Sequence, residues 1–409
     1  MNVFLHTFGC RANQYDTEVV RQAFVDQGAT IVATPDSADI AVVNSCTVTE
    51  ESEAKMRRYI RRLARAGRGN LATVVMGCAA ALDDGSIAGL PSVTRVVRGA
   101  DPAAVLDAAG LEGARVSPVL RRFVTHARAW LKIQDGCDEH CTFCATTLAR
   151  GANRSRPVAD LIREARALGE HHAEIVLTGV HIGTYGRDRE EGRGEGEGGI
   201  GALVEALVNA VPSVRFRLSS IEATEIDDRL ARMMIETPGH LAPHVHAPLQ
   251  SGSDPVLRRM GRHWYSAGSY RARIEFLAEW MPVFGLGADI IAGFPGESED
   301  DHRATVEIVR TLPFTYLHVF PFSARPDAPA TRLGDALPPA VVRERAAELR
   351  ELGEARAHAY RLAQRGRVAD GVAGGHGGGC VEALTEDYLS VPVPLDAWDG
   401  KRRFPVTIL

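Results

Sequence analysis

The sequence has few of the features that mark secreted, membrane-bound or broadly nucleic-acid-binding proteins. Its 409 residues include only seven cysteines, an odd number that argues against a disulfide framework. The longest apolar run, near residues 71–82, is too short to span a bilayer. Residues 1–6 lack the basic start and apolar stretch of a secretory signal, so we expect a cytoplasmic protein. The net charge of -5 gives no overall attraction to RNA, which leaves only local basic patches for such contacts.

The composition is that of a globular protein with more than one core. Hydrophobic residues make up 45% of the chain and charged residues 24%. A chain of 409 residues is long enough for two or three domains.

Three of the cysteines lie within eight residues, in the segment 135–144. Cys137, Cys141 and Cys144 follow an apolar, strand-like run. Three thiolates hold three irons of a [4Fe–4S] cube and leave the fourth iron open to a substrate. A structural zinc site is the alternative, but it needs a fourth ligand, for which only His140 is nearby. The spacing therefore favours an iron–sulfur cluster with one open iron.

Three further cysteines each end an apolar run in the first hundred residues. Cys10, Cys46 and Cys78 end the runs 3–10, 40–46 and 73–78, and an amphipathic stretch follows each. Strands alternating with helices predict a parallel sheet, in which ligands bind beyond the carboxyl ends of the strands. We therefore expect a second three-cysteine cluster site, the alternative being three small buried apolar residues. The seventh cysteine, Cys380, has no partner at a ligand-like spacing and is expected to bind nothing.

Six apolar runs with helices between them follow a linker at residues 111–128. They predict an α/β fold in which a partial (β/α)6 barrel, with its chemistry at the carboxyl-terminal mouth, follows the amino-terminal parallel sheet. The runs are 129–134, 174–179, 214–219, 244–248, 287–293 and 316–321. A helix and a small β domain end the chain. The expected domains are 1–115, 116–335 and 336–409.

Several charged or histidine-containing segments have two open interpretations. The basic residues Arg150, Arg154 and Arg156 follow the cysteine loop and are expected to contact phosphates or to be simply solvated. The helix that starts at Glu50 has a basic face with the same two interpretations, formed by Lys55, Arg57, Arg58, Arg61, Arg62, Arg65 and Arg68. Residues 187–199 are rich in glycine and charge and are expected to form a mobile loop. The pair His171 and His172 lacks a third ligand and is expected at the surface.

Taken together, these motifs resemble the radical S-adenosylmethionine (SAM) methylthiotransferases. The resemblance covers the three separated cysteines, the cysteine loop, the partial barrel and a short carboxyl-terminal domain like a reduced TRAM module. Residues 6–18, His-Thr-Phe-Gly-Cys-Arg-Ala-Asn-Gln-Tyr-Asp-Thr-Glu, are most similar to the branch that modifies N6-threonylcarbamoyladenosine beside the tRNA anticodon. Residues 177–186, Leu-Thr-Gly-Val-His-Ile-Gly-Thr-Tyr-Gly, point to the same branch.

The resemblance implies two [4Fe–4S] clusters and a radical reaction. The open iron of the Cys137, Cys141 and Cys144 cluster would bind SAM, whose cleavage gives a 5'-deoxyadenosyl radical that takes hydrogen from adenine C2. The cluster on Cys10, Cys46 and Cys78 would hold the sulfur, and a second SAM would supply the methyl group. The implied partners are the tRNA anticodon stem-loop and an electron donor such as flavodoxin or ferredoxin. The resemblance implies no side chain that acts as a general acid or base.

The resemblance also implies SAM-binding residues, each of which has ordinary packing as its alternative. Phe143 would neighbour the adenine, Gly179 would let the backbone approach the SAM amino group, and Glu222 would accept from the ribose or the amino group. Gln250 and Gly293 would complete the site at later strand ends. The chain departs from the family at residues 145–148, where Ala-Thr-Thr-Leu replaces bulky residues before Ala-Arg-Gly.

Two other functions compete with this expectation. One is methylthiolation of isopentenyladenosine or of a ribosomal protein side chain. The other is a non-catalytic iron–sulfur protein that binds RNA. A carrier normally ligates every iron, so two groups of three cysteines favour the enzyme.

Overall fold

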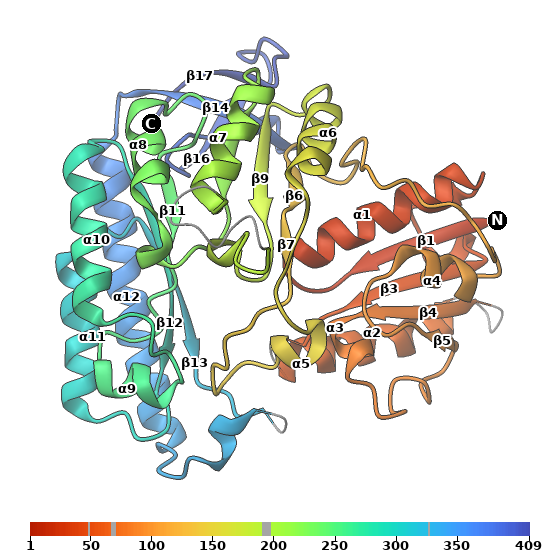
Figure 1. The fold of residues 1–409 in the computed structure, drawn as a ribbon, viewed down its shortest axis with the longest axis horizontal. Coiled ribbons are helices and arrows are strands. Elements are labelled where there is room, and N and C mark those ends of the chain that lie inside the picture. The colour runs from red at the N-terminus through yellow and green to blue at the C-terminus, as the bar shows by residue number, and fades with distance from the viewer. Residues whose placement is uncertain (48–49, 67–70, 190–197, 326–327) are drawn as a thin grey trace.

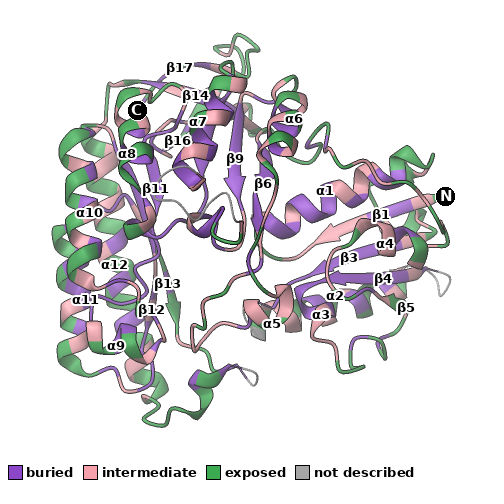
Figure 2. Cartoon of the chain, viewed as in Figure 1, coloured by how far each residue is buried: buried purple, intermediate pink, exposed green. Residues whose placement is uncertain are grey.

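The computed structural model describes residues 1–47, 50–66, 71–189, 198–325 and 328–409. An amino-terminal α/β domain lies beside a partial barrel, and the carboxyl-terminal sheet packs at one end of the barrel (Figure 1). The buried residues concentrate in the strands of both bodies, and the outer helix faces are exposed (Figure 2). The mixed α/β architecture expected from the sequence is confirmed.

The amino-terminal domain is a five-stranded parallel sheet with helices on both faces. Its strand order is β2-β1-β3-β4-β5, with β1 (Asn2–Thr7), β2 (Thr30–Ile31), β3 (Ile40–Ser45), β4 (Ala72–Gly77) and β5 (Val93–Val96). Helices α1 (Arg11–Asp26) and α4 (Pro102–Ala108) cover one face; α2 (Glu50–Ala66) and α3 (Cys78–Ala81) cover the other. Val42 and Val43 of β3 point into these opposite cores, as alternation along a strand requires.

The central domain is a curved wall of six parallel strands. They are β6 (Ala129–Lys132), β9 (Glu174–Thr178), β10 (Arg215–Leu218), β11 (His244–His246), β12 (Gly285–Ala292) and β13 (Tyr316–Pro321). The first three form one parallel group and the last three another, and the parallel bridge between Ser220 and His246 joins the groups. The six strands fall on the six apolar runs of the sequence, so the expected partial barrel is confirmed.

Helices cover the outside of the barrel wall. They are α6 (Val158–Gly169), α7 (Ile200–Ala210), α8 (Asp228–Glu236), α9 (Asp254–Arg259), α10 (Ala267–Trp280) and α11 (Glu299–Thr311). On the amino-terminal side, α1 packs against β6, and α3 packs against the short helix α5 (Thr146–Arg150). These contacts bring the carboxyl ends of the strands in both domains near each other.

The carboxyl-terminal part consists of one long helix and a four-stranded antiparallel sheet. Helix α12 (Pro339–Ala363) packs on β13 and α11, so it continues the barrel wall. The sheet has the order β16-β15-β14-β17, with β14 (Val368–Gly377), β15 (Cys380–Leu384), β16 (Ser390–Pro394) and β17 (Arg403–Thr407). Cys380 starts β15, in this separate sheet.

A buried ion-pair cluster joins this sheet to the barrel. Glu174 accepts hydrogen bonds from Arg215 Nε at 2.7 Å and Arg217 Nε at 2.9 Å. The same arginines donate to backbone oxygens of Asp370, Thr385 and Glu386. Full burial of three charged side chains is tolerated here because nearly every donor has a partner.

Two further expectations concern irregular segments. Residues 109–128 contain no helix or strand, and they contact α1, where Gln22 Nε2 donates to Val119 O at 2.8 Å. His172, which follows α6, lies 3.1 Å from Phe123 N and 2.9 Å from Ala127 O. The expectation that His172 is a surface residue was therefore wrong, because it fixes this connection. Much of the expected loop at 187–199, namely residues 190–197, lies outside the described residues.

Within the described chain, no helix is long and apolar enough to cross a membrane.

Candidate active site

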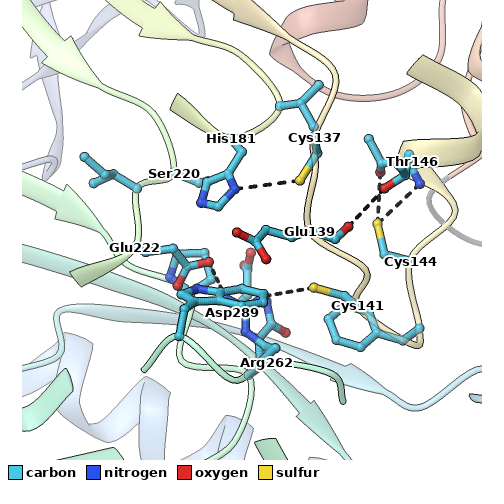
Figure 3. Close-up of a pocket in the computed structure, with 17 residues that line it drawn as sticks. Cys137, Glu139, Cys141, Cys144, Thr146, His181, Ser220, Glu222, Arg262 and Asp289 are labelled. Atoms are coloured by element: carbon cyan, nitrogen blue, oxygen red, sulfur yellow. Dashed lines mark hydrogen bonds and ion pairs between the residues drawn. The ribbon is translucent and has the colours of Figure 1, made fainter. Parts of the chain in front are cut away.

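The barrel mouth contains a cavity of about 260 Å³ at the carboxyl ends of its strands. All three cysteines of the loop line it, as Figure 3 shows. Segments after four barrel strands and one residue within β12 supply the rest of the lining, which includes Phe143, His181, Glu222, Pro248, Gln250, Arg262, Trp264 and, from β12, Asp289. The structure thus places Phe143, Glu222 and Gln250 in the same cavity lining as the three cysteines.

Backbone contacts hold the cysteine loop against the barrel. Gly136 has φ +72°, and a Cβ there would lie 1.9 Å from Ala152 O, so only glycine fits at the start of the loop. Cys137 N donates to Gly151 O at 3.0 Å. Farther along, Thr142 N donates to Met260 O at 2.9 Å. The loop is therefore fixed at both ends before any cofactor binds.

Each cysteine of the loop has a polar neighbour. Cys137 Sγ lies 3.7 Å from His181 Nδ1, and Arg262 Nη1 donates to Cys141 Sγ at 3.5 Å. Cys144 Sγ lies 3.0 Å from Thr146 Oγ1. Thr146 belongs to the segment that departs from the family pattern, so this departure places a hydroxyl group beside the third cysteine.

The electrostatics of the loop suit thiolates that are balanced by cations. Burial raises the pKa of the Cys141 thiol to about 12, although Arg262 acts in the opposite direction. Burial lowers the pKa of His181, but hydrogen bonds to Cys137 and Glu225 outweigh it and raise the pKa to about 10. A metal ion removes the proton from such a thiol, because the thiolate is the ligand. Arg262 and His181 would then offset the negative charge.

The spacing of the cysteines argues against a single zinc ion. Among the described residues, three ligand atoms of this kind lie within 4.8 Å of one another only in the group His246, Asp289 and His318. Thiolates on one zinc lie about 3.8 Å apart, as a tetrahedron with ~2.3 Å bonds requires. A cube separates its thiolates more widely, because each binds a different iron. Neither cysteine set meets the closer spacing among the described residues.

Two buried polar atoms in the same cavity lack partners. Arg262 Nη2 donates to Glu222 Oε1, whereas Glu222 Oε2 and Trp264 Nε1 have no hydrogen-bond partner among the described residues. Burial raises the pKa of Glu222, and Arg262 opposes that rise. A buried carboxylate oxygen and a buried indole N–H without partners are costly unless a ligand uses them. These groups fit a polar ligand that accepts and donates hydrogen bonds, such as SAM.

Gln250 adopts a strained backbone at the wall of the cavity. Its φ is +60°, and its N–H donates to Asp289 O at 2.8 Å while its C=O accepts from Ile291 N at 2.9 Å. Such a conformation costs on the order of 1 kcal/mol or more for a residue with a side chain. Strain of this kind persists where surrounding structure fixes it, which is typical of a functional site.

The group His246, Asp289 and His318 forms a hydrogen-bonded network beside this cavity. Asp289 Oδ1 lies 3.1 Å from His246 Nε2 and 3.2 Å from His318 Nδ1. Burial opposes ionisation of Asp289, but the two histidines outweigh it and hold its pKa well below the usual range. Tyr316 OH lies 3.0 Å from His246 Nδ1. The two histidines therefore keep Asp289 ionised.

The other three cysteines converge around Asn13 at the carboxyl edge of the amino-terminal sheet. Cys10 Sγ lies 3.2 Å from Asn13 Oδ1, and Asn13 Nδ2 lies 3.9 Å from Cys78 Sγ. A Cβ on Gly9 would lie 3.0 Å from Cys46 Cβ, so the third cysteine adjoins the same corner. Cys46 and Cys78 are buried and Cys10 is exposed, which leaves this group open on one side.

Arg150 lies between the barrel and the second cysteine set. Its Nε donates to Cys78 Sγ at 3.2 Å, and its Nη2 donates to Asp16 at 3.1 Å. Its Nη1 donates to Asp135 Oδ1 at 3.0 Å. A cavity of about 140 Å³ lined by Cys78 and Arg150 lies here. The guanidinium therefore connects the second cysteine set to the strand that precedes the cysteine loop.

Other residues expected in the site have different surroundings. A Cβ added to Gly179 would lie 2.7 Å from Gln134 Oε1, so Gly179 packs closely against Gln134. Gly179 is not part of the cavity lining, whereas the residues that follow it are. Gly293 has φ +74° and packs against Val342 of α12, outside the cavity lining. Both glycines permit close backbone approaches that position the neighbouring strands.

The basic residues expected to contact RNA are divided between interior and surface. Arg150 is committed to the contacts above, and Arg156 pairs with Glu164 at 2.8 Å and with Tyr15 OH at 2.9 Å. Arg154 is exposed. On α2, Arg62 stacks on Tyr59, and Arg68 lies outside the described residues. The exposed part of the basic surface is thus Arg154 and the outer face of α2.

Sequence reasoning missed three side chains that contact cysteines. Asn13 and His181 fell inside motifs that were read only as marks of resemblance, and Arg262 was not singled out. Arg262 reaches Cys141 from the loop after α9, so no local spacing connects them. Only Asn13, three residues after Cys10, has a local signal in the sequence.

Comparison with known families agrees with this geometry. Residues 2–99 match the family described as "Uncharacterized protein family UPF0004", and residues 131–309 match the Radical SAM superfamily. The radical SAM methyltransferase TsrM from Kitasatospora setae has a similar fold, with a TM-score of 0.61, 11% identity, and coverage of 80% of this chain and 76% of that chain. Fold and cysteine loop together define a radical SAM enzyme, which implies SAM and a [4Fe–4S] cluster.

Relatives of known name narrow the class. The threonylcarbamoyladenosine tRNA methylthiotransferase MtaB of Bacillus subtilis (strain 168) is 35% identical over 88% of this chain and 81% of its own length. The MtaB of Aquifex aeolicus (strain VF5) is 32% identical over 90% and 91%. The tRNA-2-methylthio-N(6)-dimethylallyladenosine synthase of Acidithiobacillus ferrooxidans (strain ATCC 53993 / BNL-5-31) is 33% identical over 85% and 80%. The chain belongs to the radical SAM tRNA methylthiotransferase family.

Proposed function

We propose that this enzyme adds a methylthio group to C2 of N6-threonylcarbamoyladenosine beside the tRNA anticodon, with two [4Fe–4S] clusters. The observation that carries the proposal is the presence of two three-cysteine sets, one lining the barrel cavity and one at the edge of the amino-terminal sheet, which Arg150 links. Similarity to two relatives named as MtaB supports the choice of nucleoside.

The side chains of this chain have distinct tasks in that reaction. Cys137, Cys141 and Cys144 would hold the first cluster, and Glu222 Oε2 would accept a hydrogen bond from the ribose or amino group of SAM. Phe143 would pack beside the adenine. When bound, the first cluster and SAM supply the 5'-deoxyadenosyl radical that removes hydrogen from the adenine. The apolar wall and strained Gln250 would exclude water from that radical.

The second cysteine set would hold the sulfur-carrying cluster. Cys10, Cys46 and Cys78 leave one iron without a protein ligand, which suits an iron that carries the sulfur to be inserted. Arg150 offsets thiolate charge at Cys78 and ties this corner to the barrel. The electron donor would be a small protein such as flavodoxin or ferredoxin. The substrate would be the anticodon stem-loop, which Arg154 and α2 would contact.

Paired cysteine variants test the division of labour. After anaerobic reconstitution the wild-type protein should hold about eight irons per chain, four in each cube. The triple variant C137A/C141A/C144A should form no 5'-deoxyadenosine. In contrast, C10A/C46A/C78A should still cleave SAM but yield no methylthiolated nucleoside. Cleavage that survives in the first variant would refute the assignment of the SAM-binding cluster.

The nucleoside assignment has its own test. Mass spectrometry of tRNA from cells that lack this gene should show loss of methylthio-threonylcarbamoyladenosine. An unchanged level of that nucleoside, with loss of methylthio-isopentenyladenosine, would move the enzyme to the other substrate. The dimethylallyladenosine relative makes this the strongest competing assignment.

A further inference from the structure

A second cavity, of about 250 Å³, adjoins the cysteine-lined cavity. The two share Phe143, Gln250 and Asp289 in their walls. The other lining residues come from β12, from the end of β13 and from the segment after β13, namely Ile291, Phe320, Pro321, Phe322, Ser323 and Arg325. Only the side chains of the shared wall therefore separate a molecule in the second cavity from one in the first.

Arg325 is a buried cation in this lining with unused hydrogen-bonding capacity. The residue is only 8% exposed, and its Nη2 donates to Thr47 Oγ1 at 2.7 Å. Its Nε and Nη1 are buried and have no hydrogen-bond partner within the described residues. A buried guanidinium with free donors is costly, because water no longer solvates it. Planar guanidinium groups pair best with carboxylates and phosphates.

The carboxylate in the shared wall does not neutralise this guanidinium through any hydrogen bond or ion pair that the structure shows. Asp289 is instead bonded to His246 at 3.1 Å and to His318 at 3.2 Å. The rest of the cavity wall is mostly apolar, with Ile291 and Phe320 among its members. A ligand with one flat apolar part and one oxyanion matches this combination.

Residues of this cavity wall connect it to both cysteine sets. It meets the first set through the shared Phe143, which lies between Cys141 and Cys144 in the loop. It meets the second through Arg325, which bonds to Thr47, the residue after Cys46. A substrate that loses hydrogen to a radical formed in one cavity and receives sulfur from the other cysteine set must lie between them. This cavity has that position.

We propose that this second cavity is the subsite for the substrate nucleoside, and that Arg325 binds an oxyanion of that nucleotide. The inference deepens the proposed function and rests on it. Two oxyanions have the required chemistry. The threonylcarbamoyl group keeps the carboxylate of threonine, and the RNA backbone carries phosphates. Isopentenyladenosine has no charge on its side chain, so only its phosphates are available.

Binding of synthetic anticodon stem-loops to the reconstituted enzyme tests the proposal. One RNA carries threonylcarbamoyladenosine and the other carries plain adenosine at the same position. The variant R325Q keeps similar size and loses the charge, and it should bind roughly 10- to 100-fold more weakly, as loss of a charged hydrogen bond requires. Unchanged affinity for both RNAs would overturn the proposal.

The pattern of loss identifies the oxyanion. Loss confined to the threonylcarbamoyl RNA assigns Arg325 to the carboxylate. Equal loss for both RNAs, with a salt dependence reduced by about one phosphate contact, assigns Arg325 to the backbone. The control R332Q removes an exposed arginine of the nearby turn η5 (Pro329–Arg332) and should leave both affinities unchanged. Equal losses for R332Q and R325Q would indicate a general charge effect and overturn the site.

A purely structural role for Arg325 makes different predictions. T47V removes the hydroxyl that anchors Arg325 and keeps the charge. If Arg325 only holds the Cys46 loop, R325Q and T47V should lose iron and affinity to the same degree, and the proposal fails. If Arg325 binds substrate, R325Q should retain its iron and its SAM cleavage without RNA. Product formation by the wild-type enzyme on threonylcarbamoyl RNA tests the proposed function separately.

Discussion

Arg150 Nε donates a hydrogen bond to Cys78 Sγ across 3.2 Å, from a helix of the barrel domain to the cysteine corner of the amino-terminal domain. The same guanidinium forms ion pairs with Asp16 of the amino-terminal domain and with Asp135 of the barrel domain. One buried side chain therefore links the corner of Cys78 to the strand that precedes the cysteine loop.

The first prediction concerns this arginine. R150M removes the guanidinium that pairs with Asp16 and Asp135, and only Lys132 still bonds to both carboxylates. We therefore expect the free energy of unfolding to fall by about 3 kcal/mol. Iron content should fall toward one cluster per chain, because the Cys78 corner loses its anchor. Chemical denaturation and iron analysis measure both effects. R150K should retain part of the stability, and a variant with full stability and full iron would contradict this role.

The second prediction concerns SAM affinity. E222Q keeps the shape of Glu222 but removes the charge that faces the cavity and pairs with Arg262. We expect SAM to bind roughly tenfold more weakly or worse, as loss of a charge-assisted hydrogen bond predicts. Equilibrium dialysis on the reconstituted protein measures this affinity.

The control for that experiment is an exposed glutamate. E205Q changes a residue whose pair with Arg229 is long, at 3.6 Å, and about half exposed, so SAM affinity should not change. If E222Q binds SAM as tightly as the wild type does, Glu222 is not a SAM ligand.

The third prediction concerns the buried ion pairs that hold the carboxyl-terminal sheet. E174Q leaves Arg215 and Arg217 buried with one carboxylate fewer, which should cost about 3–5 kcal/mol of unfolding free energy. Limited proteolysis should then release the region after α12 sooner than in the wild type. Equal protease resistance in the two proteins would show that other contacts hold the sheet.

The fourth prediction is the pH dependence of that stability. Burial opposes ionisation of Glu174, but Arg217, Arg215 and Arg128 outweigh it and hold its pKa well below the usual value. In the unfolded chain the pKa is about 4.3, so the unfolded state binds the proton first as the pH falls. The contribution of Glu174 to the free energy of unfolding is complete above the unfolded-state pKa, and it is lost as the pH falls toward the pKa of Glu174 in the folded protein. Denaturation midpoints from pH 7 to pH 4 should fall less steeply for E174Q.

The fifth prediction concerns the turn after Gln250. A Cβ on Gly252 would lie 2.6 Å from Thr305 Cα, which is backbone of α11 and cannot move aside as a side chain can. G252A should therefore lose about 1–3 kcal/mol of stability and weaken SAM binding through the displaced Gln250. G375A is the matched control, because nothing lies within 4 Å of its added Cβ. Equal melting temperatures for the two variants would contradict the close packing.

The strands and the cysteine positions could be read from the sequence because their signals are local. Apolar runs such as 174–179 and 316–321 alternate with amphipathic stretches, and the six runs of the barrel match its six strands. Cys10, Cys46 and Cys78 each end such a run, so the convergence of parallel strand ends predicted their meeting. The surroundings of His172 could not be predicted, because its partners lie in a connection without periodicity.

By itself, the sequence determined the α/β architecture, the two cysteine sets and the family, since hydrophobic period and cysteine spacing survive without any tertiary contact. Only the tertiary structure decided which polar side chains serve those cysteines. Arg262 meets Cys141 across 121 positions of the chain, and Arg325 meets Thr47 across 278. The first pair lies within the barrel and the second joins the barrel to the amino-terminal domain, and both join loops whose sequences are not periodic, so only tertiary packing brings them together.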